Sequence, residues 1–323
     1  MAHYLVTGAA GFIGSHTSHK LLEQGHTVVG IDNVNDAYDP RMKEYRLKKL
    51  QALPGFKFHR HDISDKSCIE LFNGEKLDGV IHLAARAGVR YSVENPWVFL
   101  ESNVTGTLNM LEVCRQYGCN KIVMASTSSI YGENPQYPTP ETASSSEPMQ
   151  PYAASKKGAE ALVHSYHHLF GIDATVVRYF TVYGPAGRPD LAIFRFVKWI
   201  MEGEPIRING DGNQSRGFTY VDDIARGTIA ALKPLGYEII NLGGHEVISI
   251  NELVTLVEDL TGKKANVQYG PPNLADMFMN QADVTKAREV LGWNPQVNLR
   301  EGIGNLIEWY KENREWAKDI LTP

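Results

Sequence analysis

The sequence predicts an α/β fold, a doubly wound parallel sheet with a smaller, interleaved α/β domain, from three observations. Short apolar runs rich in β-branched residues alternate with longer segments of helical periodicity. A glycine-rich turn joins the first apolar run to the first of these segments. After Arg178 the chain changes to loops rich in Gly, Pro and charged residues, interrupted by shorter helices. Apolar strands that alternate with amphipathic helices are typical of βαβ units.

Seven apolar runs are expected to form the strands of this sheet. In chain order they are YLVT, HTVVGID, FKFHRHD, GVIHLAA, KIVMAS, DATVVRYF and YEIINLGG. The seventh follows the sixth only after a long interval, so we expect it to return to the sheet from about 219–244. We therefore divide the chain into a first domain, 1–178 plus that returning strand, and a second domain, 179–323.

The clearest helix is predicted over residues 155–171. Its apolar positions follow the three-four spacing of one helix face, at Ala159, Leu162, Val163, Tyr166 and Phe170. Gly171 occupies the place of a C-terminal cap. Two further helices, 250–262 and 299–318, are expected in the second domain.

Composition excludes several classes of protein. With 323 residues, 43% of them apolar, the chain has enough material for a packed core. A net charge of -5 with scattered basic residues disfavours a nucleic-acid partner. The three cysteines, Cys68, Cys114 and Cys119, lack metal or redox spacing, and no signal or membrane segment is recognisable. We expect buried free thiols, no membrane partner and a cytoplasmic protein.

The glycine-rich turn predicts a Rossmann-type dinucleotide site. Gly8, Gly11 and Gly14 directly follow a strand and open a helix, whose positive end faces a diphosphate. Asp32 ends the next strand, 18 residues after Gly14. A carboxylate there accepts hydrogen bonds from a ribose and repels a 2′-phosphate, which favours NAD over NADP. By the same geometry Asp62 is expected near the adenine.

A tyrosine and a lysine predict proton transfer. Tyr152 and Lys156 lie four residues apart at the start of the predicted helix, and therefore on one face. A neighbouring ammonium and a nicotinamide cation both favour the phenolate. The same YxxxK spacing at Tyr45 with Lys49, and at Tyr117 with Lys121, is assigned to solvated surface.

Four hydroxyl residues, Ser126, Thr127, Ser128 and Ser129, end the apolar run KIVMA, and no carboxylate stands among them. One alternative is purely structural, because serines at such a place also cap a helix or bond local backbone. The other is that these hydroxyls face a substrate.

The pieces GAAGFIG, HLAA, Tyr152 with Lys156, RYFTVYGPAGRP and RGFTYVDDIARG resemble one family along essentially the whole chain. They are similar to extended short-chain dehydrogenases/reductases of the nucleotide-sugar epimerase and dehydratase group. The resemblance implies an NAD-binding first domain, a UDP-sugar-binding second domain and catalysis by Thr127, Tyr152 and Lys156. It also implies a homodimer through a four-helix interface around 96–117 and 155–170.

The resemblance further assigns the cofactor-binding residues, which lie along the strand ends and on the two helices that face them. They are Gly8, Gly11, Phe12, Ile13, Gly14, Asp32, Asn33, Lys43, Asp62, Ile63, Leu83, Ala84, Ala85, Asn103, Tyr152 and Lys156.

The hydroxyl strand tip narrows the reaction. Dehydratase relatives carry an acid pair there and decarboxylating relatives a glutamate, where this chain has Ser128 and Ser129. Without an acid, the expected reaction is oxidation and re-reduction at one carbon, which is epimerisation.

Two features resemble UDP-glucuronate 4-epimerases in particular: the insertion NVNDAYDPRMKEYRLKKLQ after Asp32, and FTVYGPAGRPDLAIFRF with Thr181 and Arg188. The expected reaction is the NAD-dependent conversion of UDP-glucuronate to UDP-galacturonate through a 4-keto intermediate, with NAD tightly bound and the carboxylate retained. Ala192 to Phe196 is expected to wrap the uracil. The substrate-binding residues are assigned as Arg86, Thr127, Ser128, Ser129, Thr181, Arg188, Arg195, Arg216 and Asp276.

Other interpretations stay open at this point. A 4-epimerase of UDP-glucose or UDP-N-acetylglucosamine has no need of Arg188, and a UDP-glucuronate decarboxylase is disfavoured by Ser129. A non-catalytic NAD-binding protein on the same fold is the alternative outside enzymes. His164, His167 and His168 lie on one helix whose apolar face already explains it, so no metal site is predicted.

Overall fold

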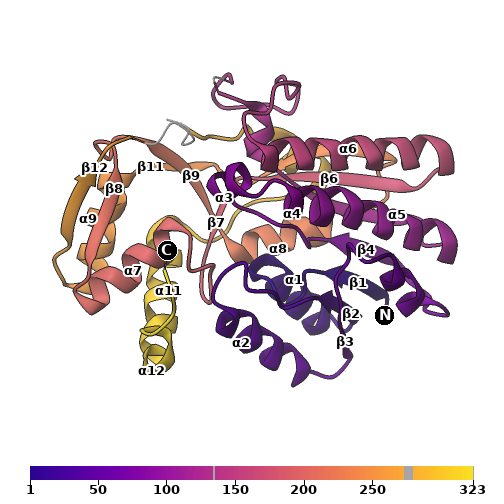
Figure 1. Ribbon diagram of the computed structural model, residues 1–323, viewed down its shortest axis with the longest axis horizontal. Helices are drawn as coiled ribbons and strands as arrows, with labels where there is room; N and C mark the ends of the chain where they lie inside the picture. Colours follow the sequence, from indigo (N-terminus) through magenta and orange to yellow (C-terminus); the bar gives the residue numbers. More distant parts are fainter. Residues whose placement is uncertain (134, 273–278, 323) are drawn as a thin grey trace.

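The computed structural model describes residues 1–133, 135–272 and 279–322. Its main sheet has seven strands in the order β10-β6-β5-β4-β1-β2-β3, all parallel (Figure 1). These strands are β1 (His3–Thr7), β2 (Thr27–Asp32), β3 (Phe56–Arg60), β4 (Gly79–His82), β5 (Lys121–Thr127), β6 (Asp173–Tyr179) and β10 (Tyr237–Leu242). Each predicted apolar run therefore contributes one strand, and the predicted fold class is confirmed.

The strand order reverses at β1, which pairs with β2 on one side and with β4 on the other. Chains that leave such a pair of strands diverge, so a crevice forms beyond their carboxyl ends. The turn after β1 lies at this point.

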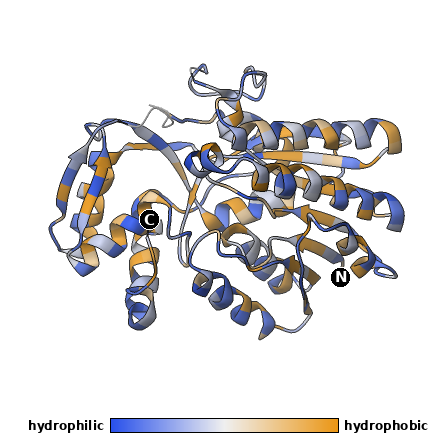
Figure 2. Cartoon of the chain, in the orientation of Figure 1, coloured by the Kyte–Doolittle hydropathy of each residue, from blue (hydrophilic) through white to orange (hydrophobic). Residues whose placement is uncertain are grey.

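Helices cover both faces of the sheet. On one face α1 (Phe12–Glu23) packs with α8 (Val221–Ala230), and α2 (Pro40–Gln51) lies beside α1. The other face is covered by η1 (Lys66–Phe72), α5 (Gly106–Tyr117) and α6 (Pro151–Phe170). Figure 2 shows hydrophobic residues along the sheet strands, and a mixture of hydrophobic and hydrophilic residues along α5 and α6. Such amphipathic helices bury one face against the strands.

The predicted helix at 155–171 is confirmed and starts earlier, at Pro151, which stands at the first turn where its missing N–H costs nothing. Gly171 ends it with a φ of +70°. Four short elements lie around its N-terminal half or just after β5: α3 (Val89–Glu94), α4 (Trp97–Phe99), the π-helical turn η2 (Leu100–Thr105) and η3 (Ser128–Tyr131).

Residues after β6 form a second region with its own core. It contains a three-stranded sheet in the order β11-β9-β7 and a two-stranded sheet of β12 and β8. The strands are β7 (Thr181–Tyr183), β8 (Pro205–Asn209), β9 (Ser215–Tyr220), β11 (Glu246–Ser249) and β12 (Asn266–Gly270). The helices are α7 (Ala192–Glu202), α9 (Ile250–Thr261), α11 (Leu299–Glu312) and α12 (Arg314–Ala317). A further helix, α10 (Thr285–Leu291), packs against β10 and α8 of the first region.

Side chains of α7, α9 and α11 pack against these strands around Phe196, Leu253 and Ile303. The return of β10 to the main sheet ties this region to the first one. The domain boundary at residue 178 stays a prediction.

The helix expected over 299–318 is interrupted, so that prediction is partly wrong. Asn313 separates α11 from α12, and its Nδ2 donates to the carbonyl oxygen of Trp309 at 2.8 Å. A side-chain amide that bonds nearby backbone competes with the helical pattern. Trp309 and Tyr310 are buried in the core.

The assignment of Tyr45 and Lys121 to solvated surface is also wrong. The Tyr45 ring lies 5.1 Å from that of Trp316, and its hydroxyl accepts a hydrogen bond from Trp309 at 3.1 Å. Lys121 is buried at the start of β5 and pairs with Asp173 on the neighbouring strand. Charged residues are rarely buried unless they are paired, and the partner Asp173 lies 52 residues away on another strand, beyond the reach of any local pattern.

All three cysteines are free and buried, as predicted. Within the described ranges, no helix combines the length and the apolar character needed to cross a membrane.

Candidate active site

The turn after β1 and the first turn of α1 require glycine at particular positions. Gly8 has a φ of +69°, and a Cβ there would lie 2.8 Å from the backbone nitrogen of Ala84. A Cβ on Gly14 would collide with the Gly8 carbonyl oxygen, to which Gly11 donates its N–H at 2.8 Å. The backbone therefore carries no side chain at Gly8 and Gly11, on either side of two alanines, and α1 follows with Phe12 and Ile13. This geometry fits a diphosphate held against a helix N-terminus.

Asp32 ends β2 with only 7% of its surface exposed. Its Oδ1 accepts a hydrogen bond from the Val34 N–H at 2.8 Å. Lys43, from α2, places its Nζ 3.8 Å from that oxygen and donates to Asn35 at 2.7 Å. Burial lowers the pKa of Lys43, and the charge of Asp32 raises it in part. The predicted ribose acceptor and the predicted cation of α2 thus lie together.

Asp62 lies beyond the end of β3, beside Asn33. Its carboxylate accepts hydrogen bonds from Asn33 Nδ2 at 2.6 Å and from the N–H and hydroxyl of Ser64 at 2.8 and 2.7 Å. Burial raises the pKa of Asp62, but these hydrogen bonds outweigh burial and hold the pKa below its usual value. The next residue, Ile63, is buried, and its carbonyl accepts from Asn109 at 2.7 Å.

The segment after β4 is fixed by two polar side chains from elsewhere. Thr7 Oγ1 accepts from the N–H groups of Leu83 and Ala84 at 3.1 and 3.0 Å. Asn103 accepts from the Arg86 N–H at 2.8 Å and donates to the Arg86 carbonyl at 3.0 Å and to Ser155 at 2.9 Å. The Asn103 amide therefore braces the segment 83–86, which includes Ala85, against α6. Direct contact of Asn103 with a cofactor stays a prediction.

The hydroxyls at the end of β5 are ordered by one another and by a distant amide. Thr127 Oγ1 accepts from the Ser129 N–H at 3.2 Å and donates to the Ser129 hydroxyl at 3.2 Å. Ser128 Oγ accepts from Asn280 Nδ2 at 3.0 Å. Thr127 thus caps the short η3 turn as well as ending the strand, so the structural interpretation holds for it. That the hydroxyl row faces a substrate stays a prediction.

Tyr152 and Lys156 stand on the first turns of α6. Tyr152 is partly buried, and its ring packs edge-on against Phe99 at 6.0 Å. Burial raises the pKa of Tyr152, while its hydrogen bond to Thr127 and the positive charge of Arg188 oppose that rise. Lys156 is buried, and burial lowers its pKa to about 8, with Glu160 acting in the opposite sense. The phenol, the strand-tip hydroxyl and the guanidinium therefore form one site.

A buried ion pair supports α6 below Lys156, and sequence reasoning missed it. Glu160 follows Lys156 by one turn and accepts two hydrogen bonds from Arg178 of β6, at 3.0 and 2.8 Å. Both side chains are only 2% exposed. Arg178 also donates to the Tyr131 hydroxyl at 3.1 Å. Glu160 and Arg178 are 18 residues apart on a helix and a strand, and no local pattern predicts that such a pair meets.

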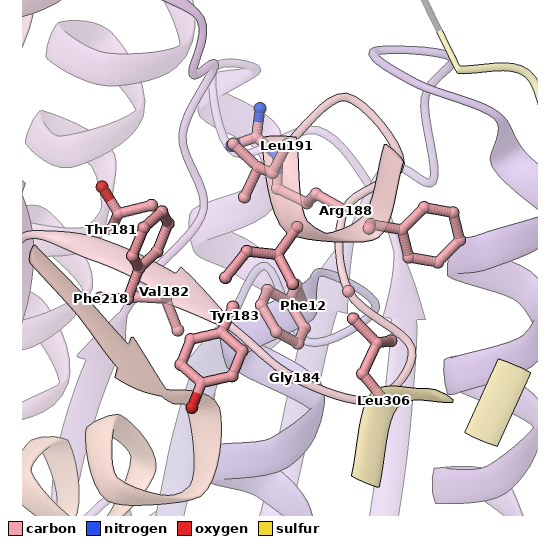
Figure 3. Close-up of a pocket in the computed structure, with 12 residues that line it drawn as sticks. Phe12, Thr181, Val182, Tyr183, Gly184, Arg188, Leu191, Phe218 and Leu306 are labelled. Atoms are coloured by element: carbon pink, nitrogen blue, oxygen red, sulfur yellow. The ribbon is translucent and has the colours of Figure 1, made fainter. Parts of the chain in front are cut away.

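Thr181 and Arg188 line a small cavity that opens to solvent, with Phe12 of the first region on one side and residues of the second region on the other. Figure 3 shows them with Phe12, Phe218 and Leu306 around this cavity. Arg188 makes a two-pronged ion pair with Asp190, at 3.1 and 2.6 Å. Burial lowers the pKa of Arg188, but the Asp190 charge and hydrogen bond outweigh it, so Arg188 is always a cation.

The other predicted substrate contacts are more scattered. Arg86 lies 4.9 Å from the centre of the Tyr91 ring, and Arg195 lies 4.4 Å from that of Trp199. Arg216 lies on β9 and donates to the Ser215 carbonyl at 2.8 Å. Asp276 lies outside the described residues.

The stretch expected to wrap the uracil has a different role for its apolar side chains. Ile193, Phe194 and Phe196 are buried in the core of the second region, because α7 presents them to α9 and α11. Ile193 and Phe194 also line the cavity beside Arg188. Contact of this stretch with the uracil stays a prediction.

The family model for the NAD-dependent epimerase/dehydratase family matches residues 4–243 of this chain. The chain is 54% identical over 323 residues to the UDP-glucuronate 4-epimerase of Thermodesulfobacterium geofontis, and the match covers 99% of each chain.

Two solved structures are similar over nearly the whole chain. One is the UDP-glucuronic acid 4-epimerase of Bacillus cereus in complex with UDP-glucuronic acid and NAD. Its TM-score is 0.90 at 37% identity, covering 96% of this chain and 99% of that one. The other is the UDP-glucose 4-epimerase of Thermotoga maritima with UDP-glucose. Its TM-score is also 0.90, at 34% identity, covering 97% of this chain and 99% of that one.

Proposed function

The chain belongs to the NAD-dependent epimerase/dehydratase family, and we propose that it is a UDP-glucuronate 4-epimerase. It interconverts UDP-glucuronate and UDP-galacturonate through a 4-keto intermediate and retains the sugar carboxylate. The relative from Thermodesulfobacterium geofontis and the Bacillus cereus structure support this substrate.

The residues along the strand ends fit NAD. The bare backbone at Gly8 and Gly11 accommodates the diphosphate, and Asp32 accepts from the adenosine ribose. Bound NAD supplies both the hydride acceptor that oxidises a sugar carbon and the donor that reduces it again. Because the cofactor is restored in each cycle, the protein needs to hold it rather than exchange it.

Tyr152 is the proton acceptor and donor at C4. It takes the proton of the C4 hydroxyl as that carbon becomes a ketone, and returns it when the ketone is reduced from the other face. The Lys156 ammonium stabilises the phenolate, and Thr127 provides a hydrogen bond to it. The oxidation and the reduction both take place at C4, so no second acid is needed at the strand tip.

Retention of the carboxylate is the harder task. A ketone at C4 is β to the carboxylate, and a β-keto acid loses CO2 when the breaking bond aligns with the carbonyl π system. Hydroxyls from Ser128, Ser129 and Thr181, with the Arg188 cation, hold the carboxylate out of that alignment and stabilise its charge.

The observation that carries the proposal is the set of hydroxyls, with no acid, that ends β5, together with Thr181 and Arg188 on the lining of one pocket. A neutral hexose has no charged group to pair with the Arg188 cation, which disfavours a UDP-glucose 4-epimerase. A decarboxylase gains nothing from groups that restrain the carboxylate.

The deciding experiment is proton NMR of UDP-glucuronate incubated with the purified protein and no added cofactor. Signals of UDP-galacturonate are expected to grow to an equilibrium mixture, and the protein is expected to carry NAD after purification. Accumulation of CO2 and a UDP-pentose would indicate a decarboxylase. Conversion of UDP-glucose but not of UDP-glucuronate would indicate the neutral-sugar alternative.

The proposal includes the remaining parts of the site. Residues 1–178 with β10 form the NAD-binding domain, and 179–323 bind the UDP moiety through Arg195, Arg216 and Asp276. Arg86, beside the cofactor segment, contacts the substrate from the other side.

We also propose a homodimer in the cytoplasm. Large apolar side chains are exposed at Trp97 and Leu100, and at Leu169 and Phe170 of α6, with Trp97 71% exposed. Apolar area of this kind around a helix pair is typical of a subunit interface. Three reduced thiols favour the reducing cytoplasm.

A further inference from the structure

The turn that carries Arg188 has an unusual backbone. Ala186, two residues before Arg188, has a φ of +51°. A non-glycine residue adopts this left-handed conformation only where its surroundings hold it there. What holds Ala186 therefore also sets where the Arg188 side chain starts.

Arg46 of α2 provides that hold. Its Nε and Nη2 donate to the Ala186 carbonyl at 2.9 and 2.7 Å, and Nη2 also donates to the Gly187 carbonyl at 3.0 Å. The remaining nitrogen, Nη1, donates to the Tyr38 hydroxyl at 2.7 Å and to the Ala10 carbonyl of the glycine-rich turn at 3.3 Å. Arg46 is 3% exposed, so these hydrogen bonds are shielded from water.

Tyr38 makes a second connection to Arg188. The Arg188 guanidinium lies 5.9 Å from the centre of the Tyr38 ring, and that of Arg46 lies 5.5 Å from it. An aromatic ring attracts cations to its face, so Tyr38 offers a surface on which both cations rest. Tyr38 and Arg46 both belong to the insertion after Asp32, in which Asn33 and Lys43 are assigned to the cofactor and no residue to the sugar.

We propose that Arg46, together with Tyr38, is a positioning residue that aims Arg188 at the sugar carboxylate; this rests on the proposed function. The insertion and the Arg188 turn then act as one unit. The Arg46 guanidinium fixes the backbone of the turn, and the Tyr38 ring fixes the Arg188 side chain. A lysine at position 46 would keep the charge, but it lacks the planar fork that serves two carbonyls at once.

The test uses binding in a Tyr152→Phe background, where turnover does not consume the ligand. Calorimetry gives the Kd of UDP-glucuronate and that of UDP, which has no carboxylate, for the parent, Arg46→Lys, Arg188→Ala and the double variant. Lys48→Met, an exposed position on the same helix, is the matched control.

Arg46→Lys is expected to raise the Kd of UDP-glucuronate about tenfold and to change the Kd of UDP by less than about twofold. The reason is that a misplaced Arg188 loses its contact with the carboxylate while the fold persists. In the Arg188→Ala background the same change is expected to have almost no further effect, since Arg46 acts through Arg188. Equal losses for UDP and UDP-glucuronate, or independent losses from Arg46 and Arg188, would overturn the proposal.

Two controls keep the result interpretable. If Arg46→Lys does not fold, Tyr38→Phe, which removes one hydroxyl from the same arrangement, is expected to weaken UDP-glucuronate alone, about threefold; no selective loss would overturn the proposal. If the protein with Tyr152 intact does not convert UDP-glucuronate, the proposed function fails instead, and that assay precedes the binding series.

Discussion

Asn280 donates a hydrogen bond from its side-chain amide to the Ser128 hydroxyl oxygen at 3.0 Å. A serine hydroxyl has one proton, so accepting this bond leaves the Ser128 O–H free to donate elsewhere. Ser128 is thereby set to donate towards an acceptor in the site, and in the proposed function that acceptor is the substrate carboxylate. The buried Asn280 amide thus decides the direction of a hydrogen bond it does not itself make to the sugar.

Replacement of Asn280 by Asp is expected to reverse this direction. The carboxylate accepts the Ser128 proton, so Ser128 presents lone pairs to a negatively charged substrate group. We expect a loss of kcat/KM of about tenfold to a hundredfold, and more CO2 released per epimerisation event. Both are measured by NMR of the sugar products and trapping of CO2.

The Ser128→Ala variant is the control for Asn280→Asp. If Asn280 acts through Ser128, the two changes together lose no more than the larger single loss. An unchanged ratio of CO2 to UDP-galacturonate would contradict the role of this pair in retaining the carboxylate.

Arg188→Ala removes the cation that faces Tyr152. Turnover of UDP-glucuronate is expected to fall about a hundredfold or more, because no other cation lines the described cavity to bind the carboxylate in place of the half-buried Arg188. The measurement is the initial rate of UDP-galacturonate formation, together with the NAD content of the purified protein, which is expected to stay the same. Arg207→Ala, an exposed arginine of β8, is the matched control. Near-normal kinetics of Arg188→Ala would reject its role.

The pH dependence of the rate follows from Lys156. Burial lowers its pKa to about 8, so the ammonium is present below that pH and is lost as the pH rises through it. Burial raises the pKa of Tyr152, so its phenolate increases with pH over the same range. Each further unit of pH above 8 then gains phenolate and loses ammonium in equal proportion.

The rate of UDP-galacturonate formation is therefore expected to rise up to about pH 8 and not beyond it. Initial rates between pH 6 and 10 at saturating substrate test this, with NAD content checked at each pH. A rate that still rises tenfold per unit between pH 8 and 10 would show that the Lys156 charge is not required.

Glu160→Gln is expected to destabilise the fold by about 3–5 kcal/mol, because it leaves the Arg178 guanidinium buried without its countercharge. Urea denaturation followed by circular dichroism measures the free energy of unfolding. Glu308→Gln breaks the exposed ion pair of Glu308 with Lys311 and is expected to change the free energy of unfolding by less than about 1 kcal/mol. Equal effects of the two changes would mean that the buried pair is no stronger than a surface one.

The main sheet was predictable because strand and helix periodicity are local signals. The runs from YLVT to YEIINLGG each carry their own pattern, and the glycine turn needs only a strand before it and a helix after it. The interrupted helix near Asn313 shows the limit of that signal, since one side-chain amide changed the outcome.

The predicted site residues were found from motifs, whereas their supports were not. Asn280 and Ser128 are 152 positions apart, and Arg46 and Ala186 are 140 apart. No periodicity connects such pairs, because only the packing of the two regions brings them together. The positive φ of Ala186 left no trace in the sequence either, since glycine is the residue that usually announces it.

The placement of β10 has a consequence for truncated forms of the protein. A fragment that ends before residue 237 would leave β6 without its neighbour, with a row of unpaired amides and carbonyls along an apolar strand. An exposed strand edge of this kind can pair with a strand of another chain. The fragment would therefore be prone to aggregate and would not form a small independent cofactor-binding protein. Evolutionary exchange of the sugar-recognising portion therefore has to carry this late strand with it or leave it in place.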